Sequence, residues 1–207
     1  MTTLNSYDRQ PTKLDYASPT QFKFSIIKLP KVEYFCIAIN VPGINLNYVE
    51  QQTPLKDIPY PGEKLKYGDL LVTFLVDENL ENYREIHGWL VGLGFPSDTE
   101  QFKTLAESGS DRFPTSRSSV STEIGKVKFK SPSQGGTVSD ATLMILTNKN
   151  NPVLEIRFED IFPISVGQLQ YNQQATDIQY LTVEVTFKYK VYNFANPGSS
   201  QTLITTT

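Results

Sequence analysis

The chain has 207 residues, of which 39% are hydrophobic and 20% are charged, and its formal net charge is −3. This length supports one sizeable domain with a hydrophobic core. The slightly acidic balance argues against a protein that grips nucleic acid through a basic surface. A single cysteine, Cys36, excludes a disulfide or a cysteine-based metal cluster within one chain.

Three segments are expected along the chain. Residues 1–19 are polar and read as an N-terminal arm, 20–194 as one domain, and 195–207 as a flexible tail rich in Pro, Gly, Ser and Thr. The start of the chain lacks the apolar core of a signal peptide, and no apolar run approaches the ~20 residues that cross a bilayer. We therefore expect synthesis in a reducing cytoplasm and no association with membranes.

Two strands are predicted at the start of the domain. Apolar residues alternate with polar ones at Phe22, Phe24 and Ile26, and again over 35–41. The short connection through Pro30 predicts that these two strands form a hairpin.

Long connections are predicted at 44–67 and at 97–125, where 99–107 could form a short helix. The first contains several prolines and Gly62, but it also carries more apolar side chains than a freely solvated loop would. We therefore expect it to pack on a neighbouring subunit through an inter-subunit set, namely Tyr48, Leu55, Ile58 and Tyr60.

A strand followed directly by a helix is predicted in the middle of the chain. The run over 70–76, which includes Phe74, is almost entirely apolar and predicts a strand covered on both faces. Asp77 or Asn79 can cap the helix that follows. Its apolar stripe, with Trp89 at the edge, consists of Tyr83, Ile86, Leu90 and Leu93.

The C-terminal third is predicted to be strand-rich. A short strand is expected at 126–130, and a hairpin of two strands over 142–147 and 153–160. The longest strand is expected over 181–191, where every second residue is apolar or aromatic, so that Val183, Val185 and Phe187 enter the core together with Phe74 and Trp89. Glu155, Arg157 and Glu159 should face away from Leu154, Ile156 and Phe158.

No catalytic, metal or cofactor site emerges from the sequence. His87 is the only histidine, and no acid or nucleophile in the sequence around it is identified as a catalytic partner. Glu155 and Glu159 would lie roughly 13 Å apart on one strand, which is wider than the carboxylate spacing of glycosidases. The sequence therefore contains no recognisable set of catalytic residues that would favour a hydrolase or another enzyme, and no cofactor is expected.

Two stretches resemble the tail tube superfamily of contractile-tailed bacteriophages. In the first, the segments 158–166, 169–171 and 178–187 follow the order of the family: a strand, a Pro-containing turn, a short apolar segment, a polar loop and a long strand. The second covers 73–89. Its Asn82-Tyr83-Arg84 and Trp89 resemble the T-even baseplate tail tube initiator, or tube cap, more than the repeating tube subunit.

The resemblance implies a mainly β (α+β) fold: an antiparallel β-sandwich or barrel of the phage tail tube type, with one packed α-helix, that gives strands to an oligomeric ring barrel. The ring would be a homo-oligomer, typically a hexamer, in the virion. Adjacent tail tube and baseplate hub proteins would bind it, and tape measure protein and DNA would pass through its bore without specific binding. The residues expected to face this lumen are Glu155, Arg157, Glu159, Thr182, Glu184, Thr186 and Lys188.

Three functions follow for the chain as alternatives. The first is a tail tube-fold ring at the baseplate end of the tube, with the repeating tube subunit as its variant. The second is a β-sandwich module that binds a small ligand or glycan, and the third is a hydrolase, which would need His87.

Overall fold

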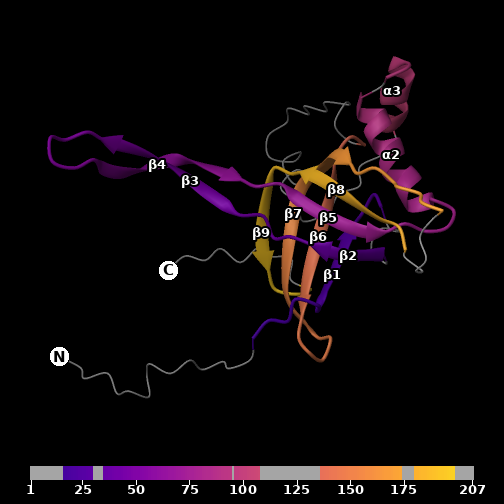
Figure 1. Cartoon of the computed structure of the whole chain (residues 1–207), viewed down its shortest axis with the longest axis horizontal. Helices are drawn as coiled ribbons and strands as arrows, with labels where there is room; N and C mark the ends of the chain where they lie inside the picture. The colour runs from indigo at the N-terminus through magenta and orange to yellow at the C-terminus, as the bar shows by residue number, and fades with distance from the viewer. Residues whose placement is uncertain (1–15, 30–34, 95, 108–135, 174–179, 199–207) are drawn as a thin grey trace, which may run out of the picture.

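The computed structural model describes residues 16–29, 35–94, 96–107, 136–173 and 180–198. This part of the chain is mainly β, with antiparallel strands and two helices (Figure 1). The strands are β1 Phe22–Ile26, β2 Cys36–Ile39, β3 Ile44–Gln51, β4 Ile58–Tyr67, β5 Leu70–Leu75, β6 Ser139–Leu146, β7 Pro152–Val166, β8 Thr182–Lys188 and β9 Val191–Ala195. The helices are α2 Glu81–Gly94 and α3 Thr99–Glu107.

Strand β7 belongs to two sheets. Its first part pairs with β6 on one side and β9 on the other, and β1 pairs with β6; we call this the first sheet. Its last part pairs with β8, followed in order by β5 and β2; we call this the second sheet. Asp160 has a φ of 55° where the strand passes from one sheet to the other. The described strands do not close into a barrel.

The predicted long strand over 181–191 is two strands. The chain leaves β8 at Lys188 and re-enters a sheet as β9 at Val191. Both strands are antiparallel to β7, and the N–H of Lys190 still donates to the carbonyl of Glu159 at 2.9 Å. The alternation therefore predicts strand structure on both sides of the break, but it does not indicate the break itself, which lies opposite Asp160.

The hairpin predicted from β1 and β2 is wrong. Strand β1 pairs with β6, and β2 pairs with β5 at the edge of the second sheet. Alternation in a sequence shows which side chains share a face, not which strand lies alongside. The hairpin predicted near 142–160 is confirmed as β6 and β7, although β7 continues through Pro163 to Val166, where a turn was expected.

The core lies between the sheets and α2. Phe74, Val183, Val185, Phe187 and Trp89 are all buried there. One face of β5 is buried and the other is only partly covered, because Leu71 is 37% exposed while Thr73 and Leu75 are half-buried. The expectation of two fully covered faces is therefore wrong.

Helix α2 presents a different face to the core from the one predicted. Its buried residues are Asn82, Ile86, Trp89 and Gly92. The Asn82 amide donates to the carbonyl of Leu75 at 2.7 Å, and its side-chain oxygen accepts the Tyr83 N–H at 2.8 Å. A polar residue was not expected in this stripe, yet its hydrogen bonds fasten the helix start to the end of β5.

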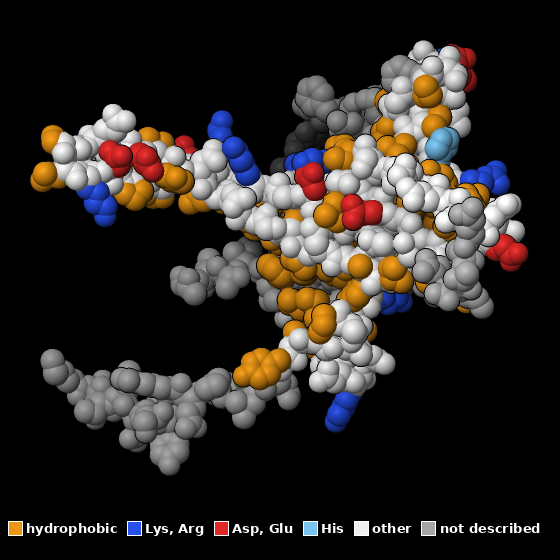
Figure 2. Space-filling model, in the orientation of Figure 1, with side chains coloured by type: hydrophobic (Ala, Val, Ile, Leu, Met, Phe, Trp, Pro, Cys, Tyr) orange, Lys and Arg blue, Asp and Glu red, His pale blue; other side chains and the backbone are white. Residues whose placement is uncertain are grey.

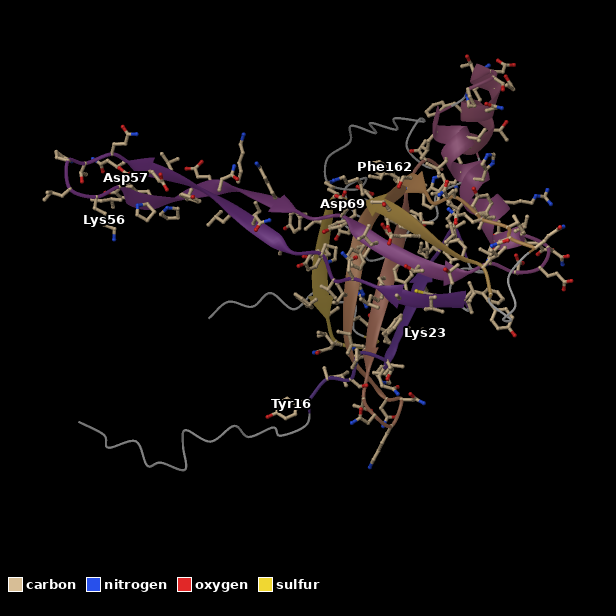
Figure 3. All side chains as sticks on the ribbon, viewed as in Figure 1. Tyr16, Lys23, Lys56, Asp57, Asp69 and Phe162 are labelled. Atoms are coloured by element: carbon tan, nitrogen blue, oxygen red, sulfur yellow. The ribbon has the colours of Figure 1, made fainter. Side chains whose placement is uncertain are left out.

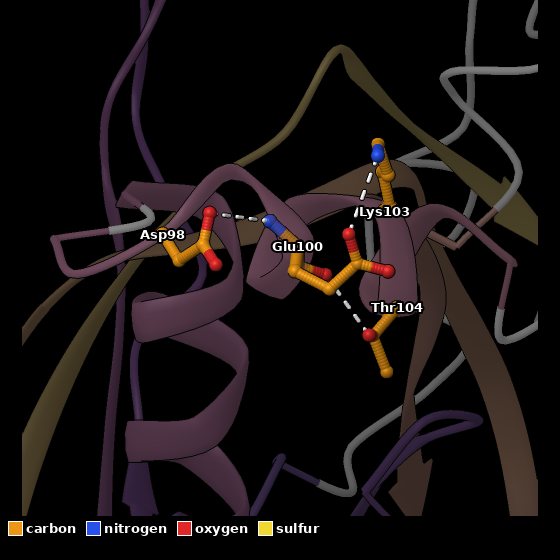
Figure 4. A network of polar contacts seen from close by, with 4 residues as sticks. All are labelled: Asp98, Glu100, Lys103 and Thr104. Carbon is orange, nitrogen blue, oxygen red and sulfur yellow. Dashed lines mark hydrogen bonds and ion pairs between the residues drawn. The ribbon is translucent and has the colours of Figure 1, made fainter.

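The short helix predicted as possible at 99–107 is confirmed as α3. It packs on α2, so the described chain has two helices where the family resemblance implied one packed helix. A Cβ on Gly92 would lie 3.0 Å from the Leu105 side chain, so the two helices approach closely. Figure 4 shows the start of α3, where Asp98 accepts the Glu100 N–H at 3.4 Å and Lys103 pairs with Glu100 at 3.2 Å. Neither described helix is long and apolar enough to span a membrane.

Residues 44–67 form a β-hairpin instead of the predicted irregular loop. Strands β3 and β4 pair with each other, apart from the two sheets, and project away from the body (Figure 1). Pro59 and Pro61 lie within β4, and prolines are tolerated there because a two-stranded ribbon has a free edge along every strand. The predicted strand at 126–130, residues 1–15 of the predicted arm and residues 199–207 of the predicted tail lie outside the described residues.

Candidate assembly site

The β3–β4 hairpin carries apolar side chains in water. Every residue of β3 is exposed, and so are all residues of β4 except Gly62 and Tyr67. Of the predicted inter-subunit set, Tyr48 is 65% and Leu55 98% exposed, and Ile58 and Tyr60 are exposed as well. Figure 2 shows apolar side chains along this projection and at its tip. So many exposed apolar groups on one projection make this hairpin the candidate contact surface of the described chain.

The hairpin is irregular near its middle. Leu46 lies opposite Leu65, and Tyr48 lies opposite Pro61. Between these two pairs, β4 has three residues and β3 has one. Gly62 sits in this bulge, and a Cβ there would lie 2.4 Å from the carbonyl oxygen of Asn47. The close approach of the two backbones requires glycine at this position.

The root of the hairpin is held by polar contacts to the body. The Asn40 amide donates to the carbonyl of Asp69 at 3.0 Å, and the Leu71 N–H donates to the Asn40 side chain at 2.7 Å. Asp69 also pairs with Lys188 of β8. In Figure 3, Asp69 marks this root, and Lys56 and Asp57 lie at the far tip.

Three tyrosines gather at the same root. The rings of Tyr67, Tyr189 and Tyr192 lie 5.7–6.0 Å from one another, centroid to centroid. Burial raises the pKa of Tyr189 to about 12 and raises that of Tyr192 as well, with the neighbouring tyrosines adding to both shifts. Both hydroxyls therefore remain protonated donors at neutral pH.

One face of the second sheet carries the polar side chains of β8 beside Leu71, Thr73 and Leu75 of β5, and the sheet has two free edges in the described part of the chain. Thr182, Glu184 and Lys188 are exposed on β8 and Thr186 is half-buried, opposite the buried side chains of the same strand. The edges are β2, where Ile37 is 46% exposed, and residues 162–166 of β7, where Ile164 is 44% exposed.

The other predicted lumen residues lie on the first sheet. Glu155 is only 7% exposed; it pairs with Arg157 at 2.7 Å and accepts the Gly198 N–H at 3.3 Å. Glu159 accepts the Asn193 amide at 3.2 Å. The seven residues predicted to face a lumen therefore lie on two sheets, and Glu155 is buried in the single chain.

The described residues give no support to the hydrolase that would need His87. His87 is exposed on α2. Burial raises the pKa of the half-buried Cys36 thiol to about 11, which disfavours a reactive thiolate. Among the described residues there is no group of three or more His, Cys, Asp or Glu side chains that could hold a metal ion.

Comparison with known families decides the relationship. The sequence profile of the phage tail tube protein family matches residues 12–195. The chain belongs to this family. As a member of this family, it is a tail tube-like structural protein.

A solved structure supports the fold of this tail tube family protein. The cap of the anti-feeding prophage, a tube-terminating cap, aligns with a TM-score of 0.52 at 8% identity and covers 93% of this chain and 99% of its own. The anti-feeding prophage baseplate aligns at a TM-score of 0.48, 11% identity and coverages of 92% and 99%. No curated protein sequence matches the chain.

Proposed function

We propose that this tail tube family protein forms a ring, a hexamer, around the conduit of a contractile phage tail. DNA and the tape measure protein pass through the bore of this ring. The observation that carries the proposal is the exposed apolar hairpin, together with a second sheet that has two free edges among the described residues. A lone chain with these features leaves strand edges and apolar surface in water, and a ring covers both.

In the ring, the second sheet of each copy continues the sheet of the next. The edge at β2 of one copy meets the edge at 162–166 of its neighbour, so that Ile37 and Ile164 become covered. Closing the sheets into a shared barrel removes both exposed edges at once.

The bore is lined by the face of this shared barrel that carries the polar side chains of β8. We assign Thr182, Glu184, Thr186 and Lys188 to it and leave out Glu155, because its carboxylate is buried against Arg157. Hydroxyls and charges of both signs on this lining suit a conduit, because DNA that slides past should not be held by a basic surface.

The position of the ring along the tail has two candidates. The baseplate-end initiator, or tube cap, is favoured by the resemblance at 82–84 and Trp89. The repeating tube subunit is favoured by the family match over 12–195. An initiator should stop at one ring and present unlike faces to the baseplate hub and the tube, whereas a tube subunit should stack on copies of itself.

Electron microscopy of the purified full chain, alone and with baseplate proteins, tests the proposal. Rings or tubes are expected, and a monomer that persists at high concentration under both conditions contradicts it. Joining Leu46 directly to Leu65 by Asn-Gly shortens the hairpin at a register pair. This variant should stay folded but fail to assemble, whereas Asp57→Asn at the tip keeps the hairpin length and should assemble.

A further inference from the structure

The hairpin is joined to the body only at its root in the described part of the chain. Beyond the root, β3 and β4 pair with each other and with no other strand. The last rung of the hairpin is the Gly68 N–H, which donates to the carbonyl of Gly43 at 2.9 Å. The direction of the projection is therefore decided by the few residues around this rung.

Two tyrosines of the C-terminal strands hold both legs of the hairpin at this rung. The Tyr192 hydroxyl donates to the carbonyl of Pro42 at 3.1 Å, on the leg that enters β3. The Tyr189 hydroxyl donates to the carbonyl of Gly68 at 3.0 Å, on the leg that leaves β4. Two bonds on opposite legs resist rotation of the hairpin, which one bond would permit.

The same tyrosines rest on the rigid core. The ring of Phe158, which is fully buried on β7, lies 5.2 Å from Tyr189 and 5.7 Å from Tyr192. Tyr67, the last residue of β4, contacts both tyrosines edge to face. The rings therefore link the hairpin to the junction of the two sheets, and their packing would survive loss of the hydroxyls.

Small rotations at the root are magnified at the tip. Strands of eight and ten residues extend roughly 30 Å at about 3.3 Å per residue, so a tilt of about 10° moves the tip by about 5 Å. Neighbouring strands in a sheet lie about 4.8 Å apart, so such a tilt moves the tip sideways by about the width of one strand and takes its apolar side chains away from the surface they would meet.

We propose that Tyr189 and Tyr192 form a clamp that fixes the direction of the β3–β4 hairpin, and that assembly depends on this direction. This inference rests on the proposed function of the hairpin as a contact between copies. It assigns the two hydroxyls a positioning role: they preorganise the hairpin and need not touch the partner copy.

The test uses the full chain with Tyr189→Phe and Tyr192→Phe combined, which removes the hydroxyls and keeps the rings. Tyr180→Phe, an exposed tyrosine outside the clamp, is the matched control. Spin labels at Leu55→Cys and Lys149→Cys, in a Cys36→Ala background, report the distance from the hairpin tip to the β6–β7 turn in the monomer. Sedimentation reports the concentration of half-assembly.

The double variant should melt cooperatively, show a broader distance distribution and require about tenfold more protein for half-assembly, since preorganisation is lost. The Tyr180→Phe control should match the wild type. An unchanged distance distribution overturns the clamp, and a broadened one with unchanged assembly overturns the dependence on direction. If the wild type itself does not assemble, the proposed function fails, while the distances still decide whether the clamp exists. If the double variant does not fold, the two single variants give the same readouts.

Discussion

The indole ring of Trp89 on α2 lies 6.4 Å from the ring of Phe187 on β8, centroid to centroid, and its N–H donates to the carbonyl of Thr137 at 3.0 Å. The Trp89 side chain thus holds α2 against the second sheet and against Thr137, which lies just before β6. Trp89→Ala should lower the free energy of unfolding by about 3–5 kcal/mol, because it leaves a large cavity. Urea denaturation measures this loss.

His87→Ala is the matched control for Trp89→Ala. His87 is exposed on the same helix, so its removal should change the free energy of unfolding by less than about 0.5 kcal/mol. If the two substitutions lowered the free energy of unfolding equally, the packing of Trp89 would not be what holds α2 against the core.

Gly62→Ala should damage the hairpin and spare the body. The added Cβ would lie 2.4 Å from the carbonyl oxygen of Asn47, so β3 and β4 must separate at the bulge. The melting temperature of the core should stay the same while assembly declines. Gly43→Ala, where a Cβ meets nothing within 4 Å, is the control, and normal assembly of Gly62→Ala would contradict the need for this bulge.

Charges at the free edges of the second sheet should block ring closure. Ile37→Lys on β2 and Ile164→Lys on β7 place an ammonium group where the neighbouring sheet is proposed to lie, and lysine on an edge strand discourages pairing. Both variants should remain folded monomers in sedimentation experiments. Ile27→Lys, at an exposed position after β1, should assemble; if all three variants assemble alike, the proposed edges are wrong.

The free energy of unfolding should fall at alkaline pH through Tyr189. Its pKa is 10.0 when unperturbed and about 12 in the folded chain, chiefly through burial. Below pH 10 both states hold the proton and the full stability is present; between pH 10 and 12 the unfolded state loses its proton first, so stability falls as pH rises.

Urea denaturation at several pH values in this window measures the slope. Tyr189→Phe should flatten it, and Tyr180→Phe should retain the slope of the wild type. Identical slopes for all three proteins would mean that Tyr189 ionises in the folded chain as readily as in the unfolded one.

Local patterns in the sequence predicted strands and their buried faces well. The alternation at Val183, Val185 and Phe187 corresponds to buried side chains on β8, and the connection before Pro152 is a hairpin turn. These features depend on neighbours in sequence, which is why they can be read without the fold.

Features set by distant contacts were missed. The partner of β1 is β6, more than a hundred residues away, and no local signal encodes that pairing. Pro59 and Pro61 made β4 look like a loop, because proline disrupts strands inside a sheet but not at a free edge. The roles of Tyr189 and Tyr192 were also invisible, since their partners Gly68 and Pro42 offer only backbone carbonyls.

The sharing of β7 between the two sheets has a mechanical consequence. A force applied to the second sheet reaches the first through the covalent backbone at Asp160, and not only through side-chain packing between layers. Separating the two sheets would require breaking the backbone hydrogen bonds of β7 on both sides of Asp160. A tube wall built from such subunits should therefore transmit an axial force without separation of the two sheets of each subunit.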